Sequence, residues 1–92
     1  MIKSFRQDGL ERFFETGSKS GIRPEHAKRL AVQVGRLDGA TCSDDMNMPG
    51  WRFHGLHGDL AVHYAVSVSG NWRLTVKFEG KDAVLVDDQD SH

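Results

Sequence analysis

The fold is decided by residues 60–88, which read LAVHYAVSVSGNWRLTVKFEGKDAVLVDD. In most of this stretch apolar residues occupy every second position, which is typical of strands that bury one face. Glycine-containing segments at 69–71 and 80–82 interrupt the alternation and predict hairpin turns. The stretch therefore predicts three consecutive antiparallel strands, over residues 60–68, 72–79 and 83–87.

The N-terminal part of the chain has a helical pattern instead. Residues 10–16 predict a short helix, and residues 24–37 predict a longer one that begins at Pro24 and ends before Gly39. Apolar residues of the longer helix form one stripe: Ala27, Leu30, Ala31, Val34 and Leu37. Four polar residues are predicted to lie off this stripe: Lys28, Arg29, Gln33 and Arg36.

Two further strands are predicted at residues 1–7 and 51–54, and a loop at 41–50. No linker is long enough to separate two domains, so residues 1–92 are expected to form one domain. Together these patterns predict an α+β fold in which two N-terminal helices pack on one face of a small, mainly antiparallel sheet.

Composition narrows the class of protein. The chain has 92 residues, and its longest uninterrupted apolar run, residues 83–86, is far too short to span a membrane. The N-terminal residues carry charge without an apolar segment behind it, so no signal peptide is expected. A single cysteine, Cys42, cannot form an internal disulfide bond. These features predict a cytoplasmic protein that makes no contact with membranes.

Charge is distributed unevenly along the chain, although the formal net charge is only −1. Residues 1–36 contain eight Lys/Arg and four acidic residues, for a net +4, whereas residues 37–92 contain four and nine, for a net −5. The basic part could face a nucleic acid or an acidic partner, or it could be an ordinary solvated surface.

Alternation along the strand at 72–79 predicts two chemically different sheet faces. If Trp72 packs beneath the helices, then Arg73, Thr75 and Lys77 must lie on the face turned away from them, here called the outer face. In the neighbouring strand, His63 and Ser67 are expected on the same outer face. Cations and hydroxyl groups on a twisted sheet could hold a strand of nucleic acid.

Groups able to transfer protons lie near this predicted face. His54 and His57 precede the central strands, and the chain ends in Asp90, Ser91 and His92. Imidazoles and carboxylates can transfer protons near neutral pH, and the Arg73 guanidinium can stabilise a phosphorane. These residue types are the ones that metal-independent cleavage of a phosphodiester requires. No sequence spacing typical of a metal site is present, so no metal or other cofactor is expected.

Several short segments, taken in order, resemble one known family. They are the opening residues 1–5, Leu56 with Gly58-Asp59, Asn71-Trp72-Arg73 and the terminal Asp-x-His. On these segments the chain is identified as a member of the HigB branch of the RelE/ParE toxin superfamily, also described as plasmid maintenance system killer proteins. The resemblance implies a type II toxin–antitoxin system and cleavage of messenger RNA in the A site of the 70S ribosome. It also implies a small helix-turn-helix antitoxin, HigA-like, through which alone the toxin would reach operator DNA.

The resemblance also implies roles for individual residues. Four match positions of the family's catalytic site: His54, Arg73, Asp90 and His92. Arg73 would stabilise the phosphorane, His92 or His54 would act as the base, and Asp90 would orient a histidine or act as the acid. Three further residues are predicted to bind substrate: His57, Lys77 and Ser91.

Two of these positions depart from the family pattern. His57 stands where the family commonly has lysine, and Ser91 where it has tyrosine, so a weaker cation and no stacking ring are expected there. Two other functions therefore remain open at this point: a non-catalytic or gyrase-directed member of the superfamily that acts by binding protein, and an inert module that only forms the antitoxin complex.

Overall fold

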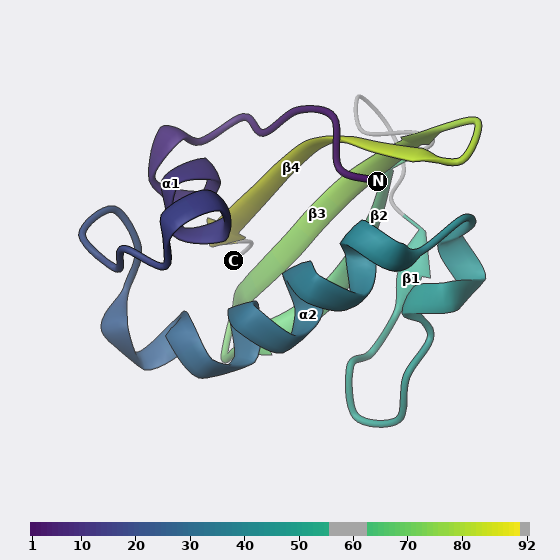
Figure 1. The fold of residues 1–92 in the computed structure, drawn as a ribbon. Coiled ribbons are helices and arrows are strands. Elements are labelled where there is room, and N and C mark those ends of the chain that lie inside the picture. Colours follow the sequence, from purple (N-terminus) through teal and green to yellow (C-terminus); the bar gives the residue numbers. More distant parts are fainter. Residues whose placement is uncertain (56–62, 91–92) are drawn as a thin grey trace.

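The computed structural model describes residues 1–55 and 63–90 as an α+β fold in which the helices lie on one side of an antiparallel sheet (Figure 1). The elements in chain order are α1 (Asp8–Thr16), the 3₁₀ helix η1 (Pro24–His26), α2 (Ala27–Gly39), the 3₁₀ helix η2 (Ser43–Met46), β1 (His54–Gly55), β2 (His63–Ser69), β3 (Trp72–Glu79) and β4 (Asp82–Asp90). The predicted fold class is confirmed.

The sheet has the order β1-β2-β3-β4, and each neighbouring pair is antiparallel. The predicted hairpins between β2, β3 and β4 are confirmed. Strand β4 continues to Asp90, beyond the predicted end at Asp87, because Asp88 and Asp90 pair with Leu74 and Trp72 of β3. Acidic residues are uncommon in strands, so the acidic composition of residues 87–90 indicated that the strand ends earlier. Strand β1 is shorter than predicted and begins at His54.

The N-terminal segment runs beside β4 in Figure 1. The predicted pairing of residues 1–7 with a later strand is confirmed, but the prediction of a strand is wrong: within the described residues the segment forms two isolated parallel bridges, Ile2 with Ala83 and Phe5 with Val86. The backbone N–H of Lys3 donates to the Ala83 carbonyl at 2.8 Å. Between the two bridges β4 is irregular, since its register against β3 shifts and Leu85 has a φ of 56°. This irregularity breaks the ladder that a regular strand would need.

The predicted longer helix is divided into η1 and α2, and its buried stripe differs from the prediction at two positions. Ala31 is exposed, whereas Gln33 is fully buried. The prediction that Gln33 lies off the stripe is therefore wrong. Its burial is possible because the side-chain Nε2 donates a hydrogen bond to the Ser67 carbonyl of β2 at 2.8 Å, which satisfies one polar atom.

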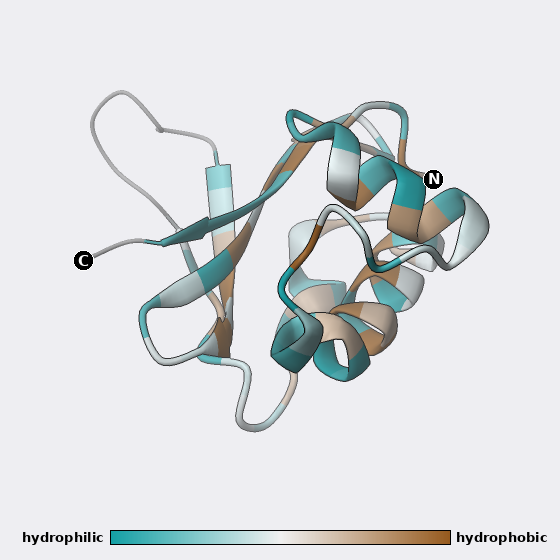
Figure 2. Cartoon of the chain, turned by 90° about the vertical axis from the view of Figure 1, so that its left-hand side faces the viewer, coloured by the Kyte–Doolittle hydropathy of each residue, from teal (hydrophilic) through white to brown (hydrophobic). Residues whose placement is uncertain are grey.

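The core lies between the helices and the inner face of the sheet. Helical side chains of Leu10, Leu30, Val34 and Leu37 pack with the strand residues Val66, Val68, Leu74, Val76 and Val86. Hydrophobic and hydrophilic residues alternate around the helices and along the strands, as Figure 2 shows. Each fully buried side chain of this size contributes about 1.5–3 kcal/mol. This burial fixes the helices on the inner face of the sheet and leaves the outer face uncovered by helices.

The segment predicted as a loop at 41–50 contains the short helix η2, whose Met46 is buried in the core. Trp51 is also buried there. None of the helices within the described residues is long and apolar enough to cross a membrane.

Candidate active site

The strand register assembles a polar row on the outer face of the sheet. Arg73 of β3 is paired with Ser67 of β2 and with Gln89 of β4. Cross-strand partners point to the same face, so these three side chains are neighbours. All three are half-buried, which leaves part of the Arg73 side chain open to solvent. The prediction that Arg73 and Ser67 share the face turned away from the helices is confirmed.

His54 belongs to the adjacent row of this face. It pairs with Ala65, which in turn pairs with Thr75. The His54 ring is exposed, and its Nδ1 lies 2.9 Å from the carbonyl oxygen of Arg52. In the neutral ring this contact requires Nδ1 to carry the hydrogen and donate it, so Nε2 is the nitrogen able to accept a proton. His54 is thus held with a basic nitrogen available on the face that carries Arg73.

Lys77 lies on the same face, four residues along β3 from Arg73, or about 13 Å away at the usual rise of a strand. It pairs with His63 of β2, and its Nζ is 3.8 Å from a carboxylate oxygen of Glu79. An extended RNA backbone would have to span this distance for Arg73 and Lys77 to contact it together. Lys77 and Arg73 are therefore too far apart along β3 to lie at one and the same point of the outer face.

Two outer-face residues are less accessible than the sequence suggested. Thr75 is 4% exposed, and its hydroxyl oxygen accepts a hydrogen bond from Gln89 Nε2 at 3.0 Å. His63 is also buried. The prediction that this face presents the hydroxyl of Thr75 is therefore wrong, because the sheet's own side chains already engage it. Among the described residues predicted to lie on this face, Arg73 and Lys77 are the cations that stay partly accessible.

Asp90 occupies a different position from the other predicted catalytic residues. It is the last residue of β4, is exposed, and pairs with Trp72 instead of Arg73. Because successive strand residues alternate in direction, this register places Asp90 on the side of the sheet that Trp72 faces. The structure therefore puts Asp90 next to the Arg73 row along the ladder but on the opposite face. His57, Ser91 and His92 lie outside the described residues.

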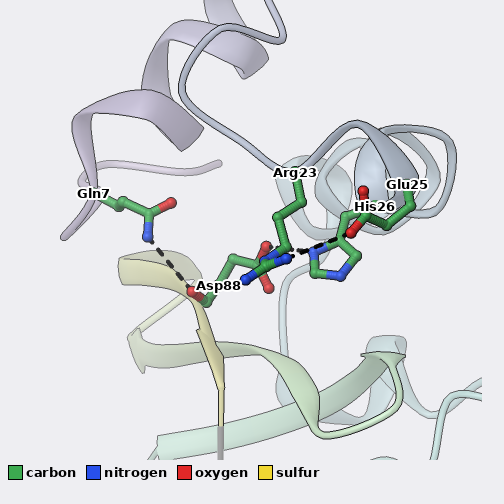
Figure 3. Close-up of polar contacts among 5 residues, drawn as sticks. All are labelled: Gln7, Arg23, Glu25, His26 and Asp88. Atoms are coloured by element: carbon green, nitrogen blue, oxygen red, sulfur yellow. Dashed lines mark hydrogen bonds and ion pairs between the residues drawn. The ribbon is translucent and has the colours of Figure 1, made fainter.

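A buried polar cluster on the inner face was not anticipated from the sequence. His26 Nδ1 lies 3.2 Å from Asp88 Oδ2, and both side chains are almost fully buried (Figure 3). The His26 ring also meets the Trp72 ring edge to face, with centroids 5.1 Å apart. The guanidinium carbon of Arg23 lies 4.7 Å from the centroid of the same Trp72 ring. The cluster joins the turn before α2 to the ends of β3 and β4.

The electrostatics of Asp88 follow from its position. Burial raises the pKa of this carboxyl, more than the hydrogen bond from His26 lowers it. A signal for the cluster was present in the sequence, since His26 precedes Leu30 by four residues and Leu37 by eleven. That spacing places His26 on the same helical stripe as the leucines.

No group of three or more His, Cys, Asp or Glu side chains that could hold a metal ion occurs within residues 1–55 and 63–90. The expectation that the site works without a metal or other cofactor stays a prediction. Cys42 is exposed and is a free cysteine. The described part of the site thus contains imidazole, guanidinium, ammonium and carboxylate groups.

Comparison with known proteins agrees with the resemblance drawn from the short segments. The sequence model of a family described as "RelE-like toxin of type II toxin-antitoxin system HigB" matches residues 3–92. The chain is also 34% identical over 92 residues to the protein named Endoribonuclease HigB of Proteus vulgaris, with the full length of both chains covered. On both grounds, the chain belongs to the HigB-like family of RelE-like toxins of type II toxin–antitoxin systems.

Proposed function

We propose that this protein is the toxin of its system by virtue of endoribonuclease activity, and that it cleaves messenger RNA in the ribosomal A site. The observation that carries the proposal is the placement of Arg73 and His54 on the outer face of one sheet, with Nε2 of His54 available to accept a proton. The full-length similarity to Endoribonuclease HigB of Proteus vulgaris supports it.

Cleavage of RNA without a metal requires three actions: removal of the proton from the 2′-hydroxyl, stabilisation of the phosphorane and protonation of the leaving 5′-oxygen. Arg73 is suited to the second action because its forked donors match two phosphate oxygens. His54 or His92 takes the proton from the 2′-hydroxyl, since imidazole exchanges protons near neutral pH. Asp90, the last residue of β4, acts not from the outer face but from the end of the sheet, where it orients a histidine or supplies the proton to the leaving oxygen.

Binding of the substrate falls to residues around this centre. Lys77 contacts the RNA backbone away from the reacting phosphate, as its position along β3 allows. His57 binds phosphate when it is protonated, and the Ser91 hydroxyl donates a hydrogen bond to phosphate. Neither residue replaces the lysine or the aromatic ring common in the family, so a weaker activity than that of typical members is expected.

A toxin of a type II system is paired with an antitoxin. We infer that the partner is a small helix-turn-helix protein, HigA-like, which contacts the basic residues 1–36 and alone connects the toxin to operator DNA. Their net charge of +4 favours an acidic partner surface. The remaining partners are the 70S ribosome and its messenger RNA, which place the protein in the cytoplasm.

The proposal is tested with purified protein and ribosomes programmed with a defined message. Wild type is expected to cut the message in the A site, with or without a chelator selective for transition-metal ions, which leaves the Mg²⁺ of the ribosome in place. His92→Ala is expected to slow cleavage by about 10²–10⁴-fold, the usual contribution of a proton-transferring side chain. Arg12→Ala serves as the control, because Arg12 is exposed on α1.

Two results would contradict the proposal. Intact message after incubation with wild type would favour a non-catalytic or gyrase-directed toxin. Inhibition of DNA supercoiling by gyrase would then identify the gyrase-directed alternative. If the single variants His92→Ala and Arg73→Ala are both as toxic as wild type, the predicted catalytic roles are excluded, even if the amount of messenger RNA in the cells falls.

A further inference from the structure

The buried pair of His26 and Asp88 contacts both strands that end at the candidate active site. Asp88 of β4 accepts from the His26 ring, and Trp72 of β3 meets the edge of the same ring. Along the ladder Asp88 pairs with Leu74, and Asp90 pairs with Trp72. The His26 ring thus contacts one residue of each of two cross-strand pairs, Leu74–Asp88 and Trp72–Asp90, which lie on either side of the Arg73–Gln89 pair.

A third contact reaches the same point from the N-terminal segment. Nε2 of Gln7 donates a long hydrogen bond of 3.5 Å to the backbone carbonyl of Asp88. Figure 3 shows Gln7 approaching Asp88 from one side and His26 from the other, each from a different part of the helical layer. The backbone of β4 is therefore held two residues before Asp90.

Stability alone does not explain an ionisable pair in this place. Asp88 Oδ1 has no hydrogen-bond partner among the described residues, and burial raises the pKa of the carboxyl. Apolar residues of similar volume usually replace a buried ion pair without loss of stability. A directional contact, by contrast, allows only one arrangement of the groups that it joins. The pair is therefore better suited to fix a position than to strengthen the core.

We propose that His26 and Asp88 are positioning residues for RNA cleavage, and that they set the location of Asp90 relative to Arg73 across the end of the sheet. This inference rests on the proposed endoribonuclease function. Its physical basis is that a misplacement of about 1 Å at a reacting group can slow catalysis by about 10²-fold. The pair itself is buried and does not touch the RNA.

The start of β4 offers a matched control. There the backbone N–H of Ile2 donates to Asp38 Oδ1 of α2 at 3.0 Å, and Ile2 bridges to Ala83. This carboxylate also ties the helical layer to β4, but at the end of the strand remote from Asp90. Asp38→Ala should lower the stability of the fold and leave the turnover number per folded molecule unchanged.

Asp88→Ala and Asp88→Asn are each made in the wild-type background and in the Asp90→Asn background, which gives a double-mutant cycle. Single-turnover and steady-state cleavage of programmed ribosomes are measured at a temperature where circular dichroism shows each variant folded. Asp88→Ala is expected to lower kcat by about 10–100-fold with KM unchanged, and Asp88→Asn, which keeps the shape and a hydrogen bond to His26, to recover most of it. In the Asp90→Asn background, Asp88→Ala should have less than about twofold further effect.

Each outcome decides the matter. An equal fold-loss in both backgrounds, or a folded Asp88→Ala with wild-type kcat, overturns the positioning role and leaves the endoribonuclease proposal intact. No cleavage by wild type overturns both. If Asp88→Ala does not fold, His26→Leu carries the same cycle, because it removes the hydrogen bond to Asp88 and fills a similar volume, and a folded His26→Leu with wild-type kcat refutes the role. A loss of kcat that disappears in the Asp90→Asn background supports the role, and an undiminished loss refutes it.

Discussion

The two faces of the sheet are built from alternate residues of the same strands, yet they treat charge in opposite ways. On the inner face, beneath the helices, the ionisable side chains His26 and Asp88 are paired with each other and almost fully buried. On the outer face, His54 is exposed and Arg73 is half-buried beside neutral partners on its neighbouring strands. The inner face therefore pairs its ionisable groups with each other, whereas the outer face leaves His54 exposed and Arg73 partly accessible.

The difference between the two faces predicts whether a substitution changes stability or catalysis. A residue of β3 that points inward loses core contacts when it is shortened, so its replacement should change the free energy of unfolding. A residue that points outward contributes little to the core, so its replacement should change catalysis. Leu74 and Arg73 are neighbours in sequence and test this contrast with the backbone environment held almost constant.

The largest effect is expected for Leu74→Ala, which would break the inner face. Leu74 is 1% exposed, and truncation of such a leucine lowers the free energy of unfolding by about 2–5 kcal/mol. That is a large part of the roughly 5–15 kcal/mol typical of small domains. Urea denaturation measures it, with Val32→Ala on the exposed side of α2 as the control. A change below about 0.5 kcal/mol would contradict the assignment of Leu74 to the core.

A comparable loss, but in rate, is expected for Arg73→Ala. Removal of a donor to the transition-state charge slows cleavage by about 10²–10³-fold, or about 2.7–4 kcal/mol in activation free energy. The free energy of unfolding should change by less than about 1 kcal/mol, because the side chain packs only partly. Arg73→Lys should be intermediate, since lysine keeps the charge without the fork. Lys81→Ala, in the exposed β3–β4 turn, is the matched control for loss of a cation. Wild-type cleavage by Arg73→Ala would remove the outer face from the mechanism.

The smallest effect should appear in the pH dependence of stability and would sharpen the comparison on the inner face. Asp88 is flanked by His26 and Arg23 from the helical layer and by Asp87 on its own strand, and its pKa lies above the ordinary value of 3.8. A raised pKa in the folded state means that ionisation of Asp88 opposes folding. Its contribution to stability is therefore greatest below the unfolded pKa and falls as the pH rises through the folded pKa.

Asp88→Asn cannot ionise, so its free energy of unfolding should improve relative to wild type as the pH rises above the ordinary carboxyl pKa of 3.8. Thermal or urea unfolding of both proteins across this range measures the difference, and Asp82→Asn, near the start of β4, controls for the loss of a carboxylate. Parallel pH profiles for Asp88→Asn and wild type would show that burial does not perturb this carboxyl.

Much of the fold followed from local pattern. The alternation in residues 63–79 predicted both central strands and the inward direction of Trp72, since a period of two leaves a strand only one way to bury its apolar side. Of the candidate site, the sharing of one face by Arg73, Lys77 and Ser67 followed from the same alternation. The position of Asp90 opposite Trp72 did not, because it depends on the irregular register between β3 and β4.

The sequence by itself determined the elements whose pattern is complete within a few residues: the hairpins, the two faces of β3 and the apolar stripe of α2 except at Ala31 and Gln33. Only the tertiary structure decided that Gln33, His26 and Asp88 are buried and that residues 1–7 lie along β4. The reason is physical. A polar side chain enters a core only when a partner satisfies it, and His26 and Asp88 stand 62 residues apart in the chain. Local spacing places His26 on the apolar stripe, but the partner that makes its burial possible, Asp88, lies far away in the chain and only the fold brings it there.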